Sequence, residues 1–257
     1  MTTLNIEDYM LSTRDCQNAV DEWNKCCSDF LRMKNLIPTN YVFDISGEQL
    51  QWMSGYKDYP EFCAAMGVYR DKLILILYPM DEKGVRIPLE KYPYNNLCEL
   101  GRDLKLQEIQ KYTIVKNAVL SKNLESINKN ADMAFPISDQ PVLPQDKAVK
   151  AIEKWRYEGI DWLYREYKEN NGEGIFKKFY VPTADLCLSD STLEGITCSF
   201  GLKYNDIYGK MLVTLIFISF RMDLQNAERA ETISNTYDWA KPCPPVCRIP
   251  DAGTCNW

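Results

Sequence analysis

Two halves of this chain resemble each other, and this internal similarity is the feature that most restricts the possible folds. Four blocks recur in the same order, with offsets that change only from 132 to 142 residues. Such a series predicts a duplicated unit, so we expect two copies of one small fold. The matching blocks are 19–23 with 151–155, 43–46 with 180–183, 66–68 with 200–202, and 73–81 with 215–223.

Each copy has the pattern of a helix, a strand, a shorter helix and a β-hairpin. Apolar residues recur at helical spacing over 16–30, and a strand is expected at 41–45. Residues 46–49 (Ser-Gly-Glu-Gln) have the form of a capping box, which starts the shorter helix. These patterns predict an α+β fold with an antiparallel sheet. The hairpin strands are expected at 62–69 with 73–80, and at 195–204 with 210–222.

The segment between the copies is expected to contain one long connecting helix and then a linker. Apolar residues recur through 103–128, although they do not form a clean stripe on one helix face. Three prolines mark 131–144 as the linker. We therefore expect a first repeat with the long helix in 1–130, the linker in 131–144, and a second repeat with the C-terminal tail in 145–257.

The absence of histidine excludes several common kinds of active site. With no His in 257 residues, the chain cannot form a Ser-His-Asp triad, a Cys-His pair or an HExxH zinc site. The sequence also has no GxGxxG, GxxxxGK[ST] or GxSxG motif. An enzyme built on this chain would need carboxylates, Lys, Tyr, Cys or an oxygen-ligated metal.

Charge and hydropathy predict that the protein binds neither nucleic acid nor a membrane. The net charge is −6 and the isoelectric point is about 5.0, whereas phosphate binding depends on clustered Lys and Arg. The longest apolar run, 211–220, has ten residues and is too short to span a bilayer. The N-terminal residues show no export signal. We therefore expect a cytoplasmic protein whose cysteines, including the adjacent Cys26 and Cys27, are mainly buried thiols.

The C-terminal tail carries the most distinctive motif of the chain. Residues 242–247 read Pro-Cys-Pro-Pro-Val-Cys and follow the hairpin of the second copy. With the upstream order of helix, aromatic strand, short helix and glycine-centred hairpin, this tail resembles a group of small uncharacterised proteins that are common in Bacteroidota. The resemblance covers the second copy, and the first copy without the tail. It implies a bacterial source and this organisation, but no activity.

Cys243 and Cys247, with Cys255 beyond them, allow three interpretations. The neighbouring prolines stiffen the backbone, so packing of the tail is favoured, followed by a disulfide or redox pair. The third interpretation is a structural zinc site, which needs four ligands. No cofactor is expected, and zinc is the alternative. Without histidine, the fourth zinc ligand would be Cys98, Cys187, Cys198 or a carboxylate.

The second predicted helix contains an aromatic cluster that serves both the core and the surface. We expect Trp155, like Trp23 in the first copy, to anchor the core because these residues occupy equivalent positions. Tyr157, Tyr164 and Arg165 are the candidates for a recognition surface, since Tyr and Arg are enriched in the central residues of protein interfaces.

Asp81 and Asp223 are the candidates for carboxylate chemistry, since they end equivalent strands of the two copies. The favoured interpretation is that each is a turn residue that bonds to its own backbone.

The function we expect is binding or assembly without catalysis, with a protein partner or further copies of the same chain. The alternatives are a thiol or metal protein that uses the tail cysteines, and an enzyme that uses the two carboxylates in place of histidine.

Overall fold

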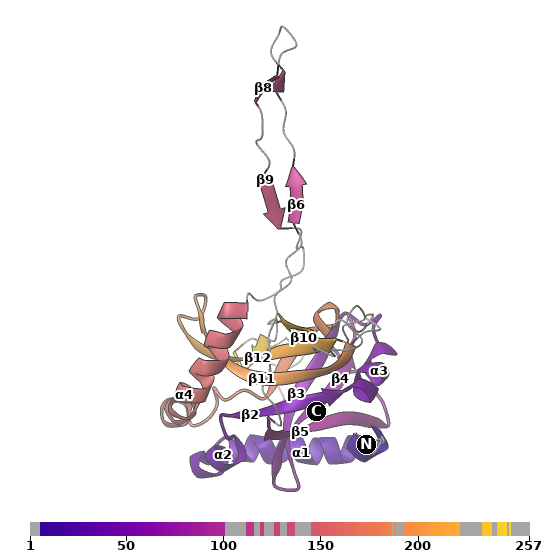
Figure 1. The fold of residues 1–257 in the computed structure, drawn as a ribbon. Helices are drawn as coiled ribbons and strands as arrows, with labels where there is room; N and C mark the ends of the chain where they lie inside the picture. Colours follow the sequence, from indigo (N-terminus) through magenta and orange to yellow (C-terminus); the bar gives the residue numbers. More distant parts are fainter. Residues whose placement is uncertain are drawn as a thin grey trace.

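One antiparallel sheet of ten strands forms the centre of the structure (Figure 1). The structure is a computed structural model and describes residues 6–100, 112–115, 119–120, 126–128, 133–136, 145–186, 188, 193–221, 233–237, 241–245 and 247. With four α-helices in these ranges, the sheet confirms the predicted α+β class. In chain order its strands are β1 (Met10–Ser12), β2 (Tyr41–Ser46), β3 (Glu61–Tyr69), β4 (Lys72–Met80), β5 (Lys91–Glu99), β10 (Lys178–Pro182), β11 (Leu193–Asn205), β12 (Lys210–Arg221), β13 (Ile233–Tyr237) and β14 (Lys241–Cys243).

The strand order interleaves the two halves of the chain. The order is β13-β12-β11-β2-β5-β4-β3-β10-β14, and β1 pairs with β5 outside this path. Strand β2 of the first half therefore extends the β11–β12 hairpin of the second half. In the same way, β10 of the second half extends the β3–β4 hairpin of the first half. The sheet curls toward a barrel, and β2 and β5 join its two parts over 41–43 and 97–99.

Both predicted hairpins are present. In the first, Arg70 and Asp71 have φ angles of 49° and 58°, which are typical of a two-residue turn that matches the twist of the strands. In the second, residues 206–209 form the turn, and Gly209 has a φ of 61°.

Four helices accompany the sheet: α1 (Thr13–Cys26), α2 (Phe30–Leu36), α3 (Gly47–Ser54) and α4 (Gln145–Asn170). The predicted capping box is confirmed at the start of α3, where Gln49 N–H donates to Ser46 Oγ and Ser46 N–H donates to Gln49 Oε1. Two 3₁₀ turns, η1 (Ile6–Tyr9) and η2 (Thr183–Leu186), precede β1 and follow β10.

The helices α1 and α4 lie on the sheet at glycine positions. A Cβ atom added to Gly67 of β3 would lie 3.0 Å from the Cβ of Ala19 in α1. A Cβ added to Gly201 of β11 would lie 3.4 Å from the Cβ of Ala151 in α4. Each hairpin thus has a glycine where a small helical residue approaches the strand closely.

The two predicted tryptophan anchors are confirmed in the main core. Trp23 has 0% and Trp155 has 1% of its surface exposed. The ring centroid of Phe176 lies 5.9 Å from that of Trp23 and 6.3 Å from that of Trp155. Trp23 also donates from Nε1 to the carbonyl oxygen of Phe176 at 3.0 Å. One phenylalanine from the second half therefore connects both anchors.

The prediction of one long helix over 103–128 is wrong for the residues that the structure describes there. They form β6 (Tyr112–Val115), β7 (Val119–Leu120) and β8 (Ser126–Asn128), and β9 (Met133–Pro136) lies in the expected linker. Strand β6 pairs with β9 and β7 pairs with β8, in two small sheets separate from the main one (Figure 1). The β-branched run Thr113-Ile114-Val115 favours a strand. The apolar residues of 103–128 do not form a continuous stripe that would stabilise a helix by packing.

Candidate functional site

The helix α4 has one buried face and one exposed face, and the predicted site residues lie on the exposed one. Trp155 and Trp162 are buried, whereas Arg165 is exposed and Tyr157 and Tyr164 are 75% and 45% exposed. Residues seven or eight positions apart return to the same side of a helix. The structure therefore brings the two tyrosines and the arginine together on one face that faces solvent.

Each of the two tyrosines has a cationic group over its ring. The guanidinium carbon of Arg156 lies 5.7 Å from the ring centroid of Tyr157, and Lys168 Nζ lies 5.7 Å from that of Tyr164. Tyr164 also packs edge-on against Phe30 of α2, with ring centroids 5.0 Å apart. This contact fixes α2 beside the exposed face of α4.

The turn between β11 and β12 is also attached to α4. Trp162 donates from Nε1 to the carbonyl oxygen of Met211 at 2.9 Å, and Lys210 Nζ lies 3.7 Å from Glu166 Oε1. Three connected parts of the structure, α2, α4 and the end of the β11–β12 hairpin at 204–208, carry six of the eight large hydrophobic side chains that are exposed in the described part of the chain. We call these six the α2–α4 surface: Leu31, Tyr157, Tyr164, Tyr204, Ile207 and Tyr208.

Sequence reasoning found two of these six residues and missed four. Ile207 is 89% exposed, and its position in the polar turn Asn-Asp-Ile-Tyr-Gly was a usable signal, because an isoleucine in a solvent-facing turn lacks a packing role. Leu31 is 71% exposed but lies in the first turn of a helix of seven residues, where one leucine cannot be assigned to a face from the sequence.

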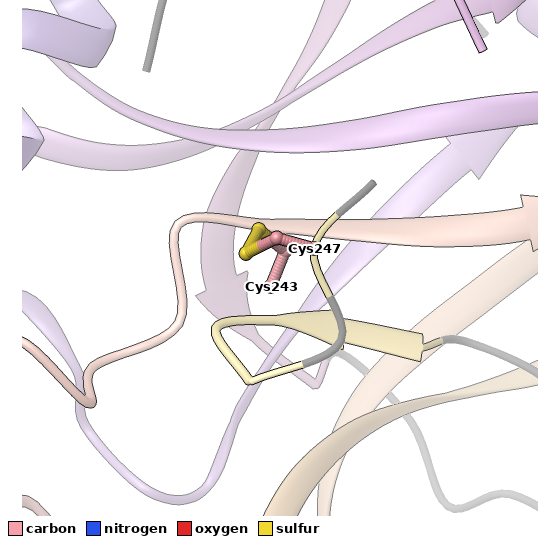
Figure 2. The surroundings of a disulfide bond; sticks show 2 residues. All are labelled: Cys243 and Cys247. Atoms are coloured by element: carbon pink, nitrogen blue, oxygen red, sulfur yellow. A yellow bond between two sulfur atoms is a disulfide. The ribbon is translucent and has the colours of Figure 1, made fainter. Parts of the chain in front are cut away.

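In the tail, Cys243 and Cys247 form a disulfide (Figure 2). Cys243 is 2% exposed and ends β14, which pairs with β10, and Lys177 N–H donates to the Cys243 carbonyl at 2.8 Å. The tail thus both packs on the sheet and closes a disulfide, so two features that were weighed as alternatives occur together. Sulfurs joined in this way are not thiolate ligands for zinc. Cys255 and Cys187 lie outside the described residues.

The remaining thiols of the described ranges are mostly buried. Cys26 and Cys27 are 0% and 4% exposed, so the prediction that they pack in the core is confirmed. Burial raises the pKa of Cys16 to about 12 and the pKa of Cys198 well above its usual value. Such thiols are poor nucleophiles at neutral pH. Within the described ranges no cluster of three or more Cys, Asp or Glu residues is arranged to hold a metal ion.

Asp81 is a turn residue, as the favoured interpretation predicted. Its Oδ1 accepts hydrogen bonds from the backbone N–H groups of Lys83 at 2.9 Å and Val85 at 2.7 Å. This carboxylate therefore organises the loop after β4. Asp223 lies outside the described residues, so no pair of carboxylates can be placed.

Comparison with known proteins adds no family to this geometry. No protein-family model, curated protein or solved structure matches the chain. Among the helices of the described ranges, none combines the length and the apolar character that crossing a bilayer requires.

Proposed function

We propose that this protein acts by binding a protein chain, and that the α2–α4 surface makes the contact. The observation that carries the proposal is the exposure of large apolar side chains on three connected elements, with Tyr157 at 75% and Ile207 at 89%. Clustered apolar residues on a surface mark interaction sites, and Tyr and Arg supply much of the binding energy in such sites.

A second copy of the same chain is the partner we propose for the exposed face of α4, because positions 153, 157, 164 and 168 match each other in an antiparallel pair of these helices. When two α4 helices pack antiparallel about a two-fold axis near their midpoints, each Tyr157 faces Tyr164 of the other helix. The same alignment places each Glu153 opposite Lys168, and both of these residues are exposed. Each interface would then contain two aromatic pairs and two ion pairs, with Arg165 beside the tyrosines.

Light scattering of the full chain after size-exclusion chromatography tests this proposal. We expect twice the chain mass of 29.8 kDa, and we expect Tyr157→Asp to give the single-chain mass. Lys168→Glu should also separate the copies, and adding Glu153→Lys should restore the dimer by exchanging the charges. Val85→Asp is the control, since Val85 is 50% exposed but belongs to the loop after β4 and not to this surface. A wild-type protein that stays at the single-chain mass, or a dimer that Tyr157→Asp leaves intact, would refute the proposal.

We also propose that the two halves are copies of one unit, as the sequence blocks predict. The strand pairing supports this: β2 joins β11 with Ile45 opposite Ile196, and β10 joins β3 with Val181 opposite Phe62. If β3 and β11 are equivalent strands, with residue 62 matching residue 196, these two pairings match 43–46 to 179–182. The sequence blocks match 43–46 to 180–183, which differs by one residue. The close contacts of Ala19 with Gly67 and of Ala151 with Gly201 are equivalent as well.

A further inference from the structure

A pocket opens where β2 and β5 separate. The two strands pair only over 41–43 and 97–99, and beyond this point 44–46 pair with β11 alone. The gap has a volume of about 360 Å³ and is lined by residues of η1, β2, α3, β4 and β5. This volume is at the lower end of the range for small-molecule sites.

Gln49 of α3 bridges β2 and β5 across this gap. Its Oε1 accepts from the Ser46 N–H of β2 at 3.0 Å, and its Nε2 donates to the Tyr94 carbonyl of β5 at 3.2 Å. Gln49 is 3% exposed. A buried side-chain amide thus takes the place of the missing backbone pairing, and the space beside it stays open.

Asn95 of β5 lines the pocket and carries a buried side-chain amide. It is 3% exposed, and its Nδ2 has no hydrogen-bond partner in the described part of the chain. A buried polar group without a partner is costly, and most buried polar groups in proteins are paired. Rotation of this amide about its Cβ–Cγ bond would present the N–H group to an acceptor oxygen on a ligand in the pocket.

Charges of both signs lie at the mouth of the pocket. Asp44, Glu48 and Lys72 line it and are exposed. Asp44 is held in place because its Oδ1 accepts from Thr197 Oγ1 at 2.7 Å. Burial raises the pKa of Cys98 in the same wall, Asp44 raises it further, and Lys72 lowers it, so both charges act on one thiol. The mouth can therefore take a ligand that carries an anionic and a cationic group together.

We propose that this pocket binds a free α-amino acid with an apolar or uncharged side chain. The carboxylate would accept from Asn95 Nδ2 and pair with Lys72, and the ammonium group would pair with Asp44 and Glu48. The ligand side chain would lie on the apolar part of the lining, which consists of Ile6, Ile45 and Leu97 with the ring of Tyr9. This site is separate from the α2–α4 surface and does not depend on dimer formation.

Calorimetric titration of the full chain with L-leucine, L-methionine and L-glutamine tests the proposal. We expect at least one of them to bind with one molecule per chain and to raise the melting temperature. For L-leucine, two analogues isolate the charges: 4-methylpentanoate lacks the ammonium group and 3-methylbutylamine lacks the carboxylate. If L-leucine is the ligand, each analogue should bind about tenfold more weakly or worse, as expected when a charged partner is left unpaired. Glucose is included as a polar ligand without charge.

Two variants connect the binding to the named residues. Asn95→Leu removes the unpaired donor, so the free protein should keep its melting temperature while binding weakens about tenfold or more. Asp44→Asn keeps an acceptor for Thr197 but removes the charge, and it should weaken binding to a similar extent. Asn24→Leu is the control, since Asn24 in α1 also has an unpaired buried atom but does not line the pocket. No binding of any of the three amino acids at millimolar concentration, equal binding by Asn95→Leu, or tighter binding of glucose would overturn the proposal.

Discussion

Replacing Gln49 should separate the two roles that its side chain combines. Gln49→Ala removes the acceptor that caps α3, which costs about 1 kcal/mol, and leaves the buried Tyr94 carbonyl without its donor, which costs about 2 kcal/mol more. Gln49→Glu keeps an acceptor for the Ser46 N–H, since Glu and Gln serve equally in a capping box. It loses the donor to Tyr94 and places a carboxylate in a site that is 3% exposed, so the free energy of unfolding at pH 7 should fall by at least about 2 kcal/mol.

Urea denaturation followed by circular dichroism at pH 7 and at pH 4 measures both variants. At the lower pH the carboxyl group introduced by Gln49→Glu binds a proton and can donate to the Tyr94 carbonyl, so the deficit of this variant relative to wild type should shrink. Gln51→Ala on the exposed side of α3 is the control and should change stability by no more than about 0.5 kcal/mol. If Gln49→Glu is as stable as wild type at pH 7, Gln49 does not bridge the strands.

Three further predictions concern the thiols and the glycines. The pKa of Cys16 is raised from 9.0 to about 12, so its neutral thiol contributes fully to the stability of the folded state below pH 9. This contribution is lost as the pH rises toward 12, because the thiol of the unfolded chain ionises first. Between pH 9 and 12, urea titrations should therefore show a smaller fall in the free energy of unfolding for Cys16→Ala than for the wild type. If this free energy falls equally in both proteins, the raised pKa of Cys16 is contradicted. Reducing the Cys243–Cys247 disulfide opens a short closed loop, so dithiothreitol should lower stability by about 2 kcal/mol in the wild type and not in the double Ser variant. Gly67→Ala should lower stability by about 2 kcal/mol, because the new Cβ meets Ala19, including its backbone carbon at 3.3 Å. Gly201→Ala should lower stability less, because its new Cβ meets mainly the flexible end of the Ile216 side chain. Thermal melts of the two variants measure the difference, and the reverse order would refute this packing argument.

The parts of the fold that the sequence predicted are those decided by residues close together in the chain. The capping box at 46–49 involves one turn of helix, and the turn at Arg70 and Asp71 joins two neighbouring apolar strands. The tryptophans Trp23 and Trp155 were also assigned to the core correctly, because each lies on the apolar stripe of a long helix. In each case the signal and the structure that it forms are local.

The parts that could not be predicted depend on partners far away in the chain. Gln49 signals a helix start, but its bond to Tyr94 crosses 45 residues and leaves no pattern in the sequence. Asn95 is one of two adjacent asparagines in a strand that both line the pocket, and only the structure shows that the side-chain amide of Asn95 is buried without a partner for Nδ2. The exposed turn residue Ile207 joins the α2–α4 surface only through the contacts of its hairpin with α4.

The interleaved strand order gives a physical reason for keeping the two halves in one chain. Within its own hairpin, β3 pairs only with β4, and β11 pairs only with β12. The other edge of β3 and of β11 would therefore be an unpaired, largely apolar strand edge if each hairpin stood by itself. An exposed edge of this kind is a template for aggregation, and natural sheets cover it. Here β10 covers β3 and β2 covers β11, so each half protects the hairpin of the other. Because each hairpin edge is covered by a strand of the other half, we expect the stability of each hairpin to depend on the presence of both halves.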